Sequence, residues 1–158
     1  MPEVIDLNKS VTLTPKETSL LTDLRNQEQV CVEKTARYAS QACDGQLKNL
    51  FTQISSDEAR HVQMIDQLFS GTLPQVNSGS SPQPQFQKSS CPPESMQQDS
   101  YLCSDMLSTE KHVSSQYDTS IFEFTDENVR DVLNHIQKEE QCHGKRIYDY
   151  MSANGMYN

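Results

Sequence analysis

The chain has 158 residues, a formal net charge of -9 and a mean hydropathy of -0.72. This length suits a single domain, the acidic balance argues against nucleic acid and anionic membranes as partners, and no run of about eighteen apolar residues is present that would span a bilayer. The first residues, Met1 to Asp6, contain neither a basic stretch nor an apolar one, so we expect an intracellular protein rather than a secreted one.

The first half of the chain predicts an N-terminal arm at residues 1–13 and a helix hairpin at residues 14–70. Thr14 and Glu17 have the spacing of a capping box, with proline at the first helical position between them. The helix that begins there should end at an Asp-Gly pair near residue 44, because glycine accepts the left-handed conformation of a helix stop. A second helix should follow and end at about residue 69, and the short turn makes the two helices antiparallel.

A crossover linker is predicted at residues 71–99, followed by a second hairpin at residues 100–158. The linker is rich in proline, serine and glutamine, and such a segment does not bury enough apolar surface to order itself. Its roughly thirty residues reach ~100 Å when extended, whereas a helix of about 26 residues is ~40 Å long, so the linker can cross a bundle end to end. Helices are expected from about residue 99 to 124 and from about 127 to 153. The fold class is therefore all-α, a four-helix bundle of two antiparallel hairpins.

Two Glu-x-x-His motifs begin at Glu58 and Glu140, and adding 82 to the numbering of the first gives the second. On a helix this motif places the carboxylate and the imidazole on the same face. Each motif lies within an apolar stripe of helical period, so its Glu and His are expected in the core. The first and third helices each carry one glutamate in the corresponding stripe, and the same numbering offset relates these two. The six candidate residues are Glu28, Glu58, His61, Glu110, Glu140 and His143.

Four buried carboxylates are costly unless cations or protons offset their charge. Two divalent cations would balance four negative charges, and two neutral imidazoles would complete the ligand shells. The ferritin-like carboxylate proteins have the same ligand set: two of their helices each supply one Glu, and the other two each supply a Glu-x-x-His motif. Oxygen and imidazole donors suit iron or manganese, so we expect two Fe or Mn ions. The alternatives are a hydrated or hydrogen-bonded polar core without metal, or helix phases that differ by one residue from those assumed.

Other polar residues are assigned to the core or to the surface according to whether they lie on the apolar stripe of their helix. Tyr38 and Tyr117 share it and are candidates for hydrogen bonds to a ligand carboxylate, the alternative being aromatic packing with a satisfied hydroxyl. Five side chains fall off the stripe and are interpreted as solvent-facing: Glu33, Asp57, His112, His135 and Glu139.

The five cysteines are an odd number and contain no Cys-x-x-Cys motif. Cys31 and Cys103 lie on core stripes, where a thiol behaves as a small hydrophobe. Cys91 is interpreted as an exposed free thiol, with an intermolecular disulfide as the alternative. Because there is no rubredoxin-like cysteine quartet, any electron donor must be external.

The second half also contains segments that are similar to a known family. They are Asp105–Lys111, Asn128–Asn134, Ile147–Met151 and the terminal Gly155-Met156-Tyr157. In these the chain resembles the coat F (CotF-like) spore coat proteins of endospore-forming bacteria. The resemblance implies a ferritin-like four-helix fold and a place in the mother-cell cytoplasm and the spore coat, with other coat proteins or a second copy of the chain as partners. Many members of that family lack a complete ligand set, and its presence here makes the chain similar to rubrerythrin, bacterioferritin and manganese catalase.

These observations support two functional hypotheses. The first is a coat F-like protein with a dinuclear Fe or Mn centre, which leaves peroxidase, catalase or ferroxidase chemistry open and requires an external electron donor. The second is a purely structural coat protein without turnover. A soluble iron store ranks last, because nothing in the sequence indicates a closed shell of subunits. A dimer is the expected oligomer.

Overall fold

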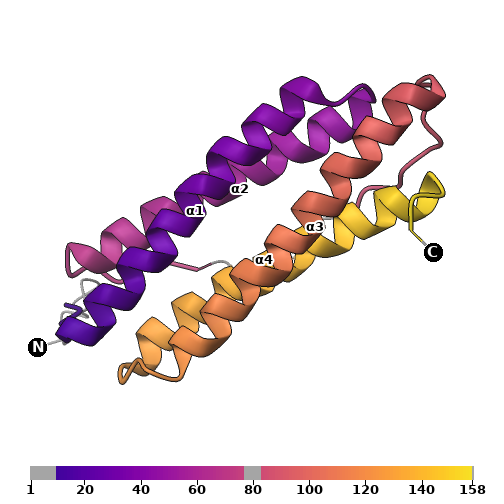
Figure 1. Cartoon of the computed structure of the whole chain (residues 1–158). Helices are drawn as coiled ribbons and strands as arrows, with labels where there is room; N and C mark the ends of the chain where they lie inside the picture. Colours follow the sequence, from indigo (N-terminus) through magenta and orange to yellow (C-terminus); the bar gives the residue numbers. More distant parts are fainter. Residues whose placement is uncertain (1–9, 77–82, 158) are drawn as a thin grey trace, which may run out of the picture.

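Four helices pack as two antiparallel hairpins that lie side by side (Figure 1). The computed structural model describes residues 10–76 and 83–157. The helices are α1 (Pro15–Gln41), α2 (Gly45–Phe69), α3 (Pro93–Ile121) and α4 (Glu127–Ala153). No strand occurs within the described ranges, although Ser10 and Thr72 form an isolated bridge. The prediction of an all-α four-helix bundle made of two hairpins is confirmed.

Local capping explains where three of the helices begin. Thr14 and Glu17 form the predicted capping box of α1, in which each side chain accepts a hydrogen bond from the backbone N–H of the other residue. Asp44 caps α2 and Asp126 caps α4, each by accepting a bond from the N–H two residues later. These bonds satisfy N–H groups that have no partner within the helix.

Helix α3 differs from the prediction at both ends. It begins at Pro93, inside the segment interpreted as linker, and it ends at Ile121 rather than near residue 124. Proline suits the first helical position, so the Pro-Pro pair that suggested a linker instead starts the helix. Directly after the added residues, the buried Asp99 joins α3 to the α1–α2 turn, because its carboxylate accepts hydrogen bonds from the backbone N–H groups of Cys43 and Asp44 at 2.8 and 3.0 Å.

The apolar core consists of two separate clusters at different levels of the bundle. One includes Leu24, Ile65, Val113 and Ile136; the other includes Leu47, Ile54, Met106 and Ile147. Along α2, α3 and α4 the Glu and His positions of the candidate set lie between the residues of these two clusters. The bundle therefore contains a polar layer between two apolar ones. Among the described residues no helix has the apolar length that a membrane crossing requires.

The second part of the linker is attached to one end of the bundle, contrary to the expectation that composition alone would leave it unordered. Phe86 packs edge-on against Tyr150 with ring centroids 5.4 Å apart. Gln87 and Gln46 are joined by two hydrogen bonds of 2.9 and 3.0 Å. Gln46 is at the start of α2 and Thr72 is beyond its end, so the two described ends of the linker lie at opposite ends of α2.

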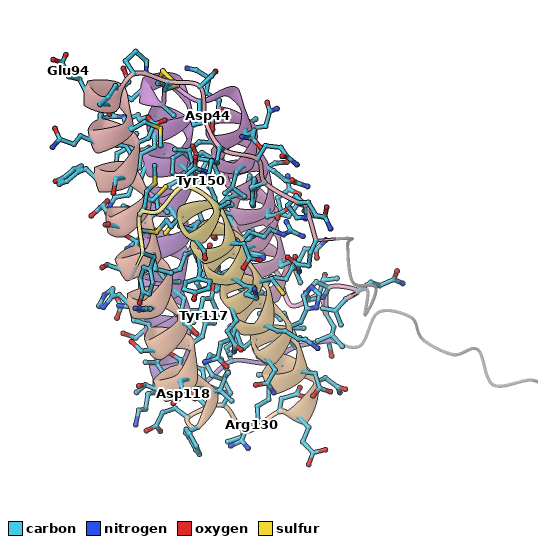
Figure 2. All side chains as sticks on the ribbon, turned by 90° about the vertical axis from the view of Figure 1, so that its right-hand side faces the viewer. Asp44, Glu94, Tyr117, Asp118, Arg130 and Tyr150 are labelled. Carbon is cyan, nitrogen blue, oxygen red and sulfur yellow. A yellow bond between two sulfur atoms is a disulfide. The ribbon has the colours of Figure 1, made fainter. Side chains whose placement is uncertain are left out.

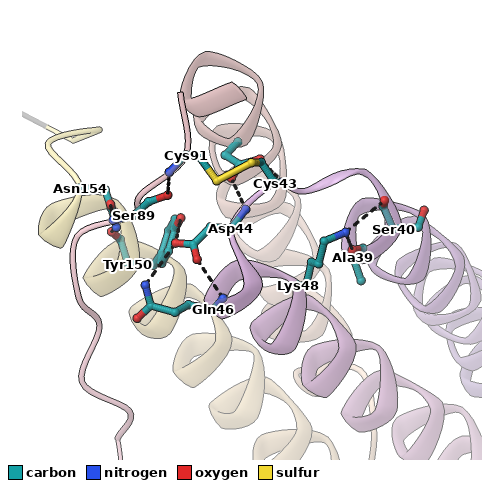
Figure 3. Close-up of a disulfide and its surroundings, with 11 residues drawn as sticks. Ala39, Ser40, Cys43, Asp44, Gln46, Lys48, Ser89, Cys91, Tyr150 and Asn154 are labelled. Atoms are coloured by element: carbon teal, nitrogen blue, oxygen red, sulfur yellow. Dashed lines mark hydrogen bonds between the residues drawn. A yellow bond between two sulfur atoms is a disulfide. The ribbon is translucent and has the colours of Figure 1, made fainter. Parts of the chain in front are cut away.

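A disulfide joins Cys43, in the turn between α1 and α2, to Cys91, just before α3 (Figure 3). The interpretation of Cys91 as a free thiol, or as a partner in an intermolecular bond, was therefore wrong. The pairing depends on where the linker returns to the bundle, which cysteine spacing does not reveal. Cys31 and Cys103 are free and buried, as predicted.

The predicted N-terminal arm lies mostly outside the described residues, which begin at Ser10. Val11 is buried, and its N–H donates to the carbonyl of Gly71 at 2.8 Å. The last residues of the arm therefore pack against the end of α2.

Candidate metal centre

Six side chains from all four helices meet in the polar layer between the two apolar clusters. They are Glu28 of α1, Glu58 and His61 of α2, Glu110 of α3, and Glu140 and His143 of α4. Each of them exposes 2% of its surface or less. Isolated buried carboxylates are strongly unfavourable, so the arrangement requires compensating charge from within the cluster or from a ligand.

The six residues form two overlapping groups of possible ligands. The first group is Glu28, Glu58, His61 and Glu140; the second is Glu58, Glu110, Glu140 and His143. Within each group, one donor atom from every residue lies within 4.8 Å of the others. Glu58 and Glu140 belong to both groups, so their carboxylates lie between the two positions. Each position has one further carboxylate and one imidazole of its own.

The two histidines have the same orientation in the two hairpins. His61 Nδ1 lies 3.0 Å from Glu140 and 3.2 Å from Glu58, and His143 Nδ1 lies 3.0 Å from Glu58. Each Nε2 instead faces a carboxylate of the opposite hairpin: His61 Nε2 is 3.3 Å from Glu139, and His143 Nε2 is 3.0 Å from Asp57. One nitrogen directed at the centre and the other held by a carboxylate is the arrangement typical of metal-ligating histidine.

Asp57 and Glu139 were interpreted from the sequence as solvent-facing, and this was wrong. Their side chains are only 13% and 29% exposed, because they lie where α2 and α4 face each other. The apolar periodicity of one helix does not show which residues beside its apolar stripe are covered by a neighbouring helix. The sequence did contain a signal, since Asp57 and Glu139 are related by the same numbering offset as the candidate ligands and each directly precedes one of them.

His135 was also interpreted as a surface residue and is instead a partner of this outer set. Its side chain is 22% exposed, and its Nε2 lies 2.8 Å from Glu139 Oε1. Glu139 is therefore placed between two imidazoles, those of His61 and His135. His112 is exposed, as predicted, and Glu33 lies on the outer face of α1.

The two candidate tyrosines have different partners. Tyr117 is fully buried, lies inside the bundle (Figure 2), and donates a hydrogen bond of 2.6 Å to Glu28 Oε1. Tyr38 is only partly buried and donates to Asp105 at 2.7 Å, so it packs as an aromatic residue with a satisfied hydroxyl. Tyr150, the other fully buried tyrosine, lies at a different level of the bundle and donates to Asp44.

Burial and mutual repulsion distribute protons unevenly among the carboxylates. Burial, with a contribution from the neighbouring Glu58, raises the pKa of Glu28 to about 7. Burial and the charges of Glu28 and Glu110 raise the pKa of Glu140 well above its ordinary value. Burial also acts to raise the pKa of Glu58, but its interactions with Glu28, His143 and His61 hold that pKa well below its ordinary value. Without a cation, the cluster therefore retains protons near neutral pH.

The two imidazoles hold some of the protons that the cluster retains. Burial acts to lower the pKa of His61 and of His143, but the surrounding carboxylates outweigh it and raise both pKa values well above the ordinary range. A carboxyl group or an imidazole coordinates a metal ion in its deprotonated form, as a carboxylate or a neutral ring, so a cation that binds here has to displace protons.

Several carboxylate oxygens in the cluster have no hydrogen-bond partner among the described residues. They are Glu28 Oε2, Glu140 Oε2 and both oxygens of Glu110. Buried polar atoms are normally hydrogen-bonded, and an exception requires an explanation. Divalent cations coordinated by these oxygens and by the two Nδ1 atoms would supply the missing partners. The donor set contains oxygen and imidazole nitrogen but no thiolate, which fits iron or manganese better than a structural zinc.

The second hairpin is also the part of the chain that is similar to a known family. Residues 98–158 match the Coat F domain. The match begins within α3 and includes all of α4, so Glu110, Glu140 and His143 lie within the Coat F segment while the first hairpin lies outside it. No curated protein and no solved structure matches the chain significantly.

Proposed function

We propose that the six-residue cluster binds two divalent iron or manganese ions, in a ferritin-like protein associated with the bacterial spore coat. The observation that carries the proposal is that the two groups of donors share Glu58 and Glu140. Two carboxylates common to both groups allow two ions to be held side by side. Four carboxylates balance the charge of two divalent ions, which removes the electrostatic cost of the polar layer.

In this proposal each residue has a defined part. Glu58 and Glu140 connect the two positions, while Glu28 and Glu110 each serve one of them. His61 and His143 offer Nδ1, and Asp57 and Glu139 accept the Nε2–H, which fixes the tautomer and the plane of each ring. Tyr117 holds Glu28 by its hydroxyl.

The chemistry that such a pair of ions supplies, when bound, is two-electron redox chemistry towards peroxide or dioxygen. Peroxidase, catalase and ferroxidase activities are all compatible with the donor set. The chain itself has no cysteine quartet that would hold a redox iron, so the electrons of any reductive step come from an external donor. The apolar clusters on both sides of the layer limit the access of water to the centre.

The test is elemental analysis of protein purified without oxygen and reconstituted with Fe(II) or Mn(II). We expect about two ions per chain in the unmodified protein, and a loss of metal in Glu58→Ala and His143→Ala. Glu94→Ala, which changes an exposed glutamate in the first turn of α3, is the matched control and should retain both ions. Well under one ion per chain in the unmodified protein would refute the proposal.

The second candidate is a structural coat protein without turnover, and the Coat F match of residues 98–158 favours it. The exposed Tyr148 and Tyr157, whose rings stack edge-on at 5.0 Å, would then belong to an assembly surface. The discriminating experiment is the double variant Glu58→Ala with Glu140→Ala in spores. Normal coat assembly and unchanged spore properties would make the metal incidental to the function.

A further inference from the structure

A groove between α3 and α4 leads from the surface to the candidate centre. It has a volume of about 510 Å³, and its lining includes the buried Glu110 and Glu140 together with the exposed Lys111 and Gln141. Asp118, also exposed, lies at its edge towards the α3–α4 turn (Figure 2). The groove therefore reaches Glu110, which belongs to the second ligand position alone, and Glu140, which both positions share. Its lining includes neither Glu28, the corresponding glutamate of the first position, nor either histidine.

The other hairpin carries different residues at the equivalent positions. Gly144 lines the groove, and its equivalent in the first hairpin is Val62, which is buried. Leu107 lines the groove, and its equivalent Arg25 forms an ion pair with Asp66 across the surface of the first hairpin at 2.6 Å. The corresponding face of the first hairpin is thus covered by an aliphatic side chain and a salt bridge.

The two single-position glutamates are also held differently. Glu28 accepts the hydrogen bond from Tyr117, whereas the residue equivalent to Tyr117 in the first hairpin is Thr35. The Thr35 hydroxyl is directed to its own helix and donates to the carbonyl of Cys31 at 2.6 Å. Both oxygens of Glu110 consequently have no hydrogen-bond partner among the described residues. Of the two single-position glutamates, Glu110 is therefore the one whose carboxylate no hydrogen bond holds, and it is the one that lines the groove.

We propose that the two ligand positions are functionally different: the groove between α3 and α4 is the entrance, and the position made by Glu58, Glu110, Glu140 and His143 is the one that exchanges its cation with solvent and faces small exogenous ligands. The position made with Glu28 and His61 holds its cation more firmly, because Tyr117 fixes Glu28 and Val62 closes that side. This inference rests on the proposed function, since it assigns different roles to the two halves of the same metal centre.

The test measures how fast Fe(II) leaves the anaerobically loaded full-length protein for a colour-forming Fe(II) chelator. The unmodified chain should release iron in two phases, one fast and one slow, each of about one ion per chain. In Glu110→Gln the fast phase should disappear, because that ion is no longer bound, and the slow phase should remain. In Glu28→Gln the slow phase should be the one that changes.

Groove variants test the route itself. A Cβ at Gly144 would lie 3.7 Å from Leu107 Cδ1, an ordinary contact, so Gly144→Ala is a control that leaves the groove open. Gly144→Leu fills the groove and should slow the fast phase towards the rate of the slow one. Ser114→Leu narrows the groove from the α3 side and should slow the fast phase in the same way. It replaces Gly144→Leu as the test if that variant loses helix content. Val62→Ala, on the closed hairpin, should leave the fast phase unchanged.

The outcomes separate the two proposals. Two bound ions that leave in one phase, or a fast phase that neither groove variant slows, would overturn the entrance and leave the dinuclear centre in place. Failure of the unmodified chain to bind iron would overturn both. Selective slowing of one ion by Gly144→Leu or Ser114→Leu, with two ions still bound, would support the inference.

Discussion

Replacing Glu110 by leucine should stabilise the metal-free protein while it removes a ligand of the proposed second metal position. Both carboxylate oxygens of Glu110 are buried without a hydrogen-bond partner in the described part of the chain, and His143 Nδ1 is 3.6 Å away. An unsatisfied buried oxygen costs about 1–3 kcal/mol. Two of them give about 2–6 kcal/mol, and allowing half for the attraction of His143 leaves about 1–3 kcal/mol for Glu110→Leu. In a chain of this length that corresponds to a rise of roughly 2–12 °C in Tm.

The assay is thermal unfolding followed by circular dichroism, first without metal and then with excess Fe(II) under nitrogen. Bound metal stabilises the unmodified protein by about 2.7 kcal/mol at one hundred times its Kd, so the advantage of Glu110→Leu should shrink or reverse when iron is added. Glu94→Leu, at an exposed position, is the control and should change neither Tm by much. A metal-free Glu110→Leu protein that melts below the unmodified one would show that the carboxylate is well satisfied and that the reasoning is wrong.

Three further predictions concern single features. Cys91→Ser opens a disulfide whose cysteines are 48 positions apart, and chain entropy sets the loss at roughly 4 kcal/mol at most in urea unfolding; a midpoint equal to that of the oxidised protein would contradict this. In the metal-free protein the pKa of Glu28 is raised from 4.5 to about 7. The stability that this shift contributes is full below the pKa of the unfolded chain, near 4.5, and is lost as the pH rises through about 7. Tm should therefore fall from about pH 5 to about pH 8, and it should fall less in Glu28→Gln. Tyr117→Phe removes the hydrogen bond to Glu28 and should weaken metal binding at that position by about 5- to 10-fold, measured by chelator competition, with Tyr38→Phe as the unaffected control.

The sequence predicted the inward-facing set well because the physical constraint on it is local. Residues three and four apart on a helix share a face whatever the neighbouring helices do, so Glu58 and His61 could be assigned to the core from their own helix. The constant numbering offset between Glu58 and Glu140 then related the two hairpins. Both inferences needed only the helical period and the order of the chain.

The errors occurred where the answer depends on a second element. Asp57 is about 100 degrees from Glu58 around the helix, and only the position of α4 decides that it meets His143 instead of water. The start of α3 at Pro93 was missed because a Pro-Pro pair suits both a linker and a first helical turn, and the choice rests on the contacts of Asp99 with the α1–α2 turn. The Cys43–Cys91 pair likewise exists because the linker returns to that turn.

The common register of the two hairpins has a consequence for how such a centre can change over time. One hairpin that carries a glutamate on its first helix and Glu-x-x-His on its second would build the same six-residue set as a homodimer, so the chain has the form that duplication and fusion of a hairpin would give. In a homodimer every substitution appears on both sides of the two-fold axis. In a single chain Gly144 and Val62, or Tyr117 and Thr35, can differ at equivalent positions. In a single chain the two halves can therefore change independently, which is what the proposed difference between the two ligand positions requires.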